Sequence, residues 1–141
     1  MNAHLTEELL IRTAAEPDRA FIMALVKEKY PDRYDKGVHY VEWCLTQPDK
    51  LVAVGPNSFG VASAYWNYGF ERRAGSSILC ARPVAGAALE IVRMLRFMIA
   101  WARQQGAQGP FRLQEDTGVD FGPLARRLGG SERIVWEIPL E

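Results

Sequence analysis

The longest pattern of hydrophobic and polar positions covers residues 76–107 and predicts a buried strand, a short loop and a long helix. The strand is predicted by the apolar run Ile78-Leu79-Cys80, which follows a turn signal at Gly75-Ser76-Ser77. In the helix, predicted over 87–105, polar residues recur at helical spacing and form a narrow stripe: Glu90, Arg93, Arg96 and Arg103-Gln104. The other positions are apolar, which indicates a helix covered on most of its sides.

Shorter patterns on either side of this unit predict the remaining elements. Apolar or alternating runs predict strands at residues 9–13, 51–54, 59–66, 111–115 and 133–140. The turn Gly55-Pro56-Asn57-Ser58 joins the second and third of these strands into a hairpin. Helical spacing predicts helices at 18–29, 36–45 and 120–129. We therefore expect one α/β domain over residues 1–141, with a mixed sheet and a right-handed parallel crossover around residues 78 to 115.

Composition and charge narrow the class of protein. The 141 residues are 48% hydrophobic and 24% charged, as in ordinary soluble globular proteins. Lys plus Arg equals Asp plus Glu at 17 each, so no overall field attracts nucleic acid or an anionic membrane. A nucleic-acid interface would require arginines from separate elements to share one face: Arg72, Arg73, Arg93, Arg96, Arg126 and Arg127. The N-terminus lacks the pattern of a signal peptide, and no window approaches the ~18 apolar residues of a membrane span. We expect a soluble, cytoplasmic protein.

The cysteines and histidines predict no chemistry of their own. Cys44 and Cys80 lie in unrelated apolar contexts and are expected to be free, buried thiols in a reducing compartment. Because Cys80 falls inside the central strand, we expect a thiol of the core without a nucleophilic role. His4 and His39 have no partners at metal-ligand spacing, so no metal site is expected.

Two segments carry a resemblance to a known family. Residues 100–107 (AWARQQGA) are similar to the end of the central helix of the GNAT superfamily of N-acetyltransferases, and residues 124–129 (LARRLG) to its later short helix. With the order of elements, the chain resembles this superfamily over nearly its whole length. The resemblance implies a GNAT-like mixed sheet and acetyl-CoA as the cofactor of an active enzyme.

The resemblance also implies a cofactor site in the loop before the long helix, where the family pattern is Q/R-x-x-G-x-G/A. Backbone N–H groups at the helix start would hold the pyrophosphate of the coenzyme. In one register Gly86, Leu89 and Ile91 occupy the motif positions; in the other, Arg82, Ala85 and Ala87 do. Neither register reproduces the motif, and the segment also suits a plain strand-to-helix turn. The implied cofactor-binding residues are Cys80, Ala81, Arg82, Ala85, Gly86 and Ala87.

The acid–base residues implied by the family are few. Glu115 and Asp116, at the end of the strand expected beside the central one, are the best candidates for the general base, although their position favours a solvated strand end and turn. Glu71 is a weaker candidate, because the adjacent Arg72-Arg73 suggests surface ion pairs. Phe121 stands where the family often has a Tyr acid and has no proton to donate.

The sequence therefore leaves two functions open. Loss of both the glycine motif and the Tyr acid favours a GNAT-fold protein with decayed catalysis that serves binding or assembly, through protein partners or self-association. The ending of the chain (DFGPLARRLGG) is similar to GNAT-like proteins of tailed phages, which would place it in a virion. The alternative is an active N-acetyltransferase that transfers an acetyl group from acetyl-CoA to a primary amine, on a small molecule or on a protein N-terminus or lysine.

Overall fold

A five-stranded mixed sheet forms the centre of the molecule. The computed structural model describes residues 10–67, 70–113, 122–132 and 138–140. The strands follow the order of the chain across the sheet, and all neighbours are antiparallel except β4 and β5, which are parallel. The predicted mixed sheet with a parallel crossover is thus confirmed. The strands are β1 (Arg12–Thr13), β2 (Lys50–Gly55), β3 (Ser58–Trp66), β4 (Arg72–Ala81) and β5 (Arg112–Leu113).

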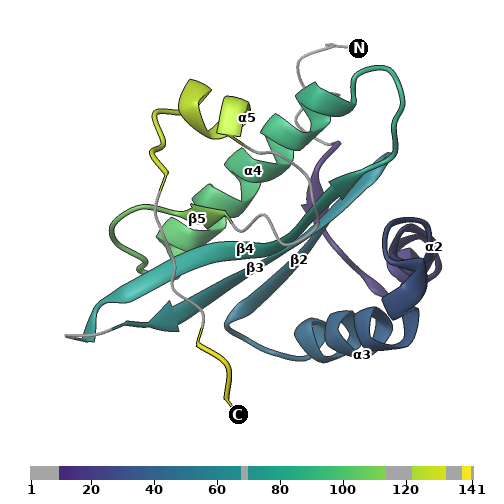
Figure 1. The fold of residues 1–141 in the computed structure, drawn as a ribbon, viewed down its shortest axis with the longest axis horizontal. Helices are drawn as coiled ribbons and strands as arrows, with labels where there is room; N and C mark the ends of the chain where they lie inside the picture. The colour runs from purple at the N-terminus through teal and green to yellow at the C-terminus, as the bar shows by residue number, and fades with distance from the viewer. Residues whose placement is uncertain (1–9, 68–69, 114–121, 133–137, 141) are drawn as a thin grey trace.

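Helices cover both faces of this sheet (Figure 1). Helices α2 (Arg19–Lys29) and α3 (Tyr34–Leu45) lie on one face, and α4 (Ala87–Gln104) crosses the other, with α5 (Gly122–Arg127) beside it. Two 3-10 turns, η1 (Glu16–Asp18) and η2 (Pro31–Arg33), each begin with a residue pair containing proline and lead into α2 and α3.

The sheet separates two apolar cores, and neighbouring residues of one strand belong to different cores. Cys80 packs with α2 and α3, whereas Leu79 packs with α4. This alternation follows from the pleat of the strand, which points successive side chains to opposite faces. The end of β4 is therefore held from both sides.

Helix α4 is less enclosed than its sequence predicted. Its buried residues are Met94, Leu95, Met98 and Ala102, which share one face toward the sheet. The side chain of Leu89 is 52% exposed. A single buried face suffices to dock the helix, so the apolar residues around the rest of its surface are not all covered.

The prediction of a turn at Gly75-Ser76-Ser77 is wrong, because these residues lie inside β4. A bulge interrupts the pairing here: Ile78 opposes Val61, but Ser76 opposes Ala62, so Ser77 is an extra residue. The Ser76 hydroxyl lies 3.0 Å from the Val61 carbonyl oxygen and 2.8 Å from that of Ile78. Small polar residues thus stabilise the bulge in β4, and the same residue types also mark turns in a sequence.

Several other predictions are confirmed, and some fall outside the described residues. The hairpin of β2 and β3 closes with Gly55 opposite Ser58, and Cys44 and Cys80 are both free and buried. Most of the predicted final strand, residues 133–137, lies outside the described residues. The side chains of Ile138 and Leu140, which follow this segment, are exposed. No helix among the described residues is long and apolar enough to span a membrane.

Candidate cofactor-binding site

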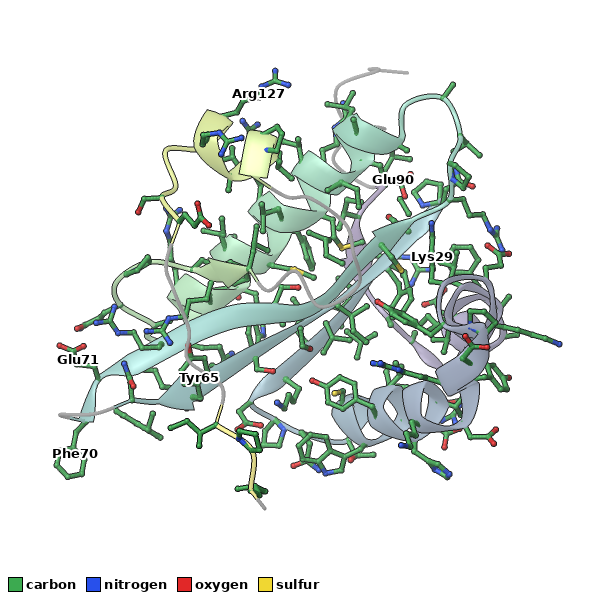
Figure 2. The ribbon with its side chains drawn as sticks, in the orientation of Figure 1. Lys29, Tyr65, Phe70, Glu71, Glu90 and Arg127 are labelled. Carbon is green, nitrogen blue, oxygen red and sulfur yellow. The ribbon has the colours of Figure 1, made fainter. Side chains whose placement is uncertain are left out.

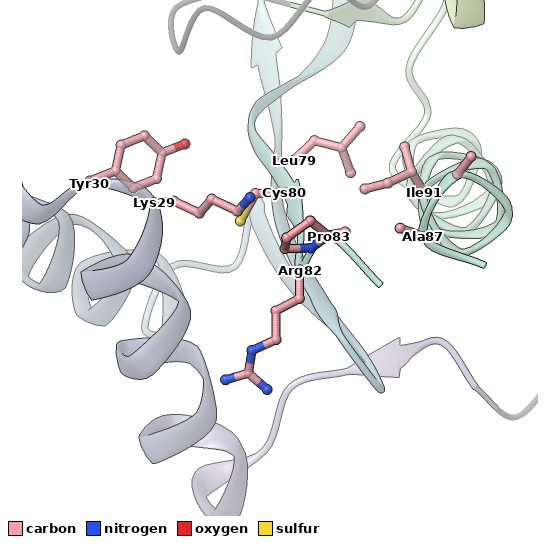
Figure 3. Close-up of a pocket in the computed structure, with 10 residues that line it drawn as sticks. Lys29, Tyr30, Leu79, Cys80, Arg82, Pro83, Ala87 and Ile91 are labelled. Atoms are coloured by element: carbon pink, nitrogen blue, oxygen red, sulfur yellow. The ribbon is translucent and has the colours of Figure 1, made fainter. Parts of the chain in front are cut away.

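A pocket of about 290 Å³ lies where the end of β4 meets the start of α4. Figure 3 shows how residues from both faces of the sheet converge on it. Its walls come from the end of α2 (Lys29, Tyr30), from β4 (Leu79, Cys80, Ala81), from the loop (Arg82, Pro83) and from α4 (Ala87, Ala88, Ile91). The pocket therefore sits beside the loop that the sequence singled out.

The sequence located one part of this pocket and missed another. Of the implied cofactor-binding residues, Cys80, Ala81, Arg82 and Ala87 line it, whereas Ala85 and Gly86 lie exposed on the outer side of the loop. Lys29 and Tyr30 were not predicted. Nothing in their local pattern separates them from an ordinary helix end, since only the packing of α2 on the sheet brings them to β4.

The side chain of Arg82 is turned toward α2. Its guanidinium donates to the Glu28 carboxylate, with an Nη2 to Oε1 distance of 3.1 Å, and lies 5.1 Å from the centre of the Phe21 ring. Figure 3 shows the side chain directed away from Ala87. The Arg82 guanidinium, which the family resemblance implied as a partner of the pyrophosphate, thus lies on the face of the sheet opposite α4.

The start of α4 is open. Gly86 is the N-cap residue, in the left-handed region at φ 83°, and no side chain caps the helix. A Cβ atom at Gly86 would meet no atom within 4 Å. The first bond of helical spacing is donated by Glu90 to the Gly86 carbonyl, so the N–H groups of Ala88 and Leu89 precede the regular ladder. Such a helix start attracts anions through its N–H groups and its dipole.

Cys80 lines the pocket but does not supply a reactive group. Burial raises the pKa of its thiol to about 12, although the nearby Lys29 ammonium acts in the opposite direction. Figure 3 shows Lys29 extending from α2 toward this thiol. A thiol with this pKa stays protonated at neutral pH and is a poor nucleophile.

Beside the pocket, one edge of β4, called the open edge below, has no partner strand in the part of the chain that the structure describes. Among the described residues, β5 pairs with β4 only at Gly75 and Ser76. The Arg82 N–H donates to the Asn57 carbonyl on the β3 side, at 2.8 Å. Because successive strand residues direct their N–H groups to opposite edges, Leu79 and Ala81 direct theirs to the open edge. No described strand pairs with β4 at these two positions, which leaves the two N–H groups within reach of a ligand that lies along β4.

No candidate for acid–base chemistry is among the described residues that line the pocket. Glu115, Asp116 and Phe121 lie outside the described residues. Glu71 is at the far end of the β3–β4 hairpin, as Figure 2 shows, and forms an ion pair with Arg73. No cluster of potential metal ligands is found among the described residues, and His39 is exposed on α3.

Comparison with known proteins identifies the fold through structure alone. No protein-family model and no curated protein matches the sequence. An integron cassette protein from the mobile metagenome of Cole Harbour Salt Marsh matches with a TM-score of 0.76 at 17% identity, covering 95% of this chain and 92% of that chain. The aminoglycoside 6'-N-acetyltransferase AAC(6')-Ig from Acinetobacter haemolyticus gives 0.73 at 17% identity, with 92% and 97% covered.

A third match was solved with a ligand. The structure of AAC(6')-Iy, in complex with the bisubstrate analog CoA-S-monomethyl-acetylneamine, gives a TM-score of 0.69 at 16% identity and covers 92% of this chain and 96% of that chain. The chain described here therefore has the GNAT fold of acetyltransferases, as its sequence predicted. At these identities the likeness establishes the fold.

Proposed function

We propose that this protein binds an acyl-CoA, with acetyl-CoA as the simplest case, and transfers the acyl group to a primary amine. The observation that carries the proposal is the open pocket between the end of β4 and the first turn of α4. A structural protein with a decayed site could fill this position with Leu89, but that side chain is half exposed.

The geometry suggests how the chain would hold the cofactor. The pyrophosphate would lie at the first turn of α4, where small residues such as Ala88 let it approach the backbone. The arm that carries the thioester would extend along the open edge of β4, within reach of the N–H groups of Leu79 and Ala81. An N–H group aimed at the thioester carbonyl would stabilise the negative charge that develops when an amine attacks.

The fold comparison supports the same class of reaction. The ligand bound to AAC(6')-Iy is a bisubstrate analog, CoA-S-monomethyl-acetylneamine. A panel of primary amines, including amino acids, polyamines, aminoglycosides and peptides with a free N-terminus, incubated with acetyl-CoA, tests the proposal. We expect release of free CoA thiol that depends on one class of amine; no release above the rate without protein, over the whole panel, would contradict the proposal.

A second candidate function is assembly through protein contacts without catalysis, including a place in a phage virion. It is favoured by the pairing of Arg82 with Glu28 and by the absence of Asp, Glu and His from the pocket lining among the described residues. Sedimentation of the purified protein tests it. A concentration-dependent oligomer that forms in the absence of acetyl-CoA, in a protein that does not bind acetyl-CoA, would favour this function over acyl transfer.

A further inference from the structure

A pair of hydroxyl groups lies beside the last residue of β4 that pairs with a described residue of β5. The Tyr40 hydroxyl on α3 is 2.8 Å from the Ser77 hydroxyl on β4. Ser77 is the extra residue of the bulge, and it directly follows Ser76, the last residue of β4 that pairs with a described residue of β5. The pair therefore marks the inner end of the open edge.

One hydrogen bond near this pair has a fixed direction. The Lys50 ammonium, which can only donate, lies 2.8 Å from the Ser63 hydroxyl oxygen, so that hydroxyl directs its own proton elsewhere. Burial raises the pKa of Tyr40, and the hydrogen bond with the Ser77 hydroxyl acts in the opposite direction. Either hydroxyl of the Tyr40–Ser77 pair can donate, and when Tyr40 donates, the Ser77 proton is left to point away from the phenol.

The pocket and this pair lie at opposite ends of the same edge. From Ser77 to Arg82 the chain advances about 17 Å at the usual rise of a strand. An extended pantetheine arm has a comparable length. A coenzyme bound as proposed above, with its pyrophosphate at α4, would therefore bring its thioester to Ser77.

We propose that the Ser77 hydroxyl is a catalytic residue that gives its proton to the departing CoA thiolate, and that Tyr40 is the positioning residue that replaces this proton. The inference rests on the proposed acyl transfer. The amine nitrogen forms a bond to the thioester carbon, the carbon–sulfur bond breaks, and sulfur keeps the electron pair and takes the Ser77 proton. Tyr40 then gives a proton to Ser77 and takes one from water. The same water takes the proton that the attacking amine releases.

The variants Tyr40→Phe and Ser77→Ala test this relay in the full chain, with the amine that the wild type acetylates. A general acid contributes on the order of 100-fold to rate, so we expect kcat to fall by about that factor in each variant. The dissociation constant for acetyl-CoA should change less than about twofold, because neither hydroxyl holds the pyrophosphate. Ser77→Thr, which keeps a hydroxyl, should retain most of the rate.

Two controls separate the relay from a structural effect. Tyr34→Phe makes the same change on the same helix and should leave kcat unchanged. The double variant of Tyr40 and Ser77 should be no slower than Ser77→Ala, because the two residues act in one path. Turnover by Tyr40→Phe or Ser77→Ala at the wild-type rate would overturn the relay and leave acyl transfer intact, whereas a wild type that does not bind acetyl-CoA would overturn both.

Discussion

The Glu28 carboxylate holds the Arg82 guanidinium at 3.1 Å, on the face of the sheet opposite the helix start that would receive an anion. Both side chains are partly exposed, at 46% and 32%. The ion pair would thus compete with the pyrophosphate of the proposed cofactor for the only arginine of the pocket lining among the described residues.

Removing this competition should strengthen cofactor binding. In Glu28→Ala the guanidinium is released, and we expect the dissociation constant for acetyl-CoA to fall about threefold, in keeping with the modest free energy of an exposed ion pair. Titration calorimetry measures the effect. Glu42→Ala is the matched control, because Glu42 pairs with Arg19 in a similar exposed contact away from the pocket. Weaker binding by Glu28→Ala would show that the pair supports the site.

The Cys80 thiol should make folding stability depend on pH in the alkaline range. Its pKa is raised from 9.0 to about 12 by burial, so between these values the unfolded chain loses a proton that the folded chain keeps. The free energy of unfolding should therefore be insensitive to this group below pH 9 and decline as pH rises from 9 to 12. Urea unfolding at several pH values should give a shallower decline for Cys80→Ala than for the wild type. Equal slopes would contradict this account.

The contact between Gly75 and Arg112 should be sensitive to a single methyl group. A Cβ atom at Gly75 would lie 2.8 Å from the Arg112 backbone oxygen, which cannot move without shifting β5. We expect Gly75→Ala to lower the free energy of unfolding by about 1–3 kcal/mol. Hydrogen exchange should show the loss of protection concentrated in β5. Unchanged stability would mean that β5 tolerates displacement from β4.

The sequence predicted the elements of this fold well, because each depends on a local pattern. The hairpin around Gly55 and the long helix from Ala87 appear at nearly the predicted residues. The bulge at Ser77 was missed, since small polar residues in a strand and in a turn look alike. Contacts between distant segments were also missed: Glu28 lies 54 positions before Arg82, and no local pattern indicates that they pair.

The candidate site was predicted in part for the same reason. The family resemblance located the loop from Cys80 to Ala87, but not the direction of the Arg82 side chain. Nor did it indicate that Tyr40 meets Ser77, because that contact arises from the packing of α3 on the sheet. Site residues that lie within one segment of the sequence could be predicted. Site residues that packing brings together from distant segments could not.

The central claim is that the first turn of α4 receives the pyrophosphate of an acyl-CoA. Titration calorimetry of acetyl-CoA into the wild type, Ala88→Glu and Ala100→Glu tests it most directly. Both substitutions add one carboxylate to α4, but Ala88 lines the pocket and Ala100 is exposed elsewhere on the helix. We predict micromolar binding by the wild type and by Ala100→Glu, and a loss of more than about tenfold in Ala88→Glu from charge repulsion. No binding to the wild type at millimolar acetyl-CoA, or equal binding to all three proteins, would contradict the account.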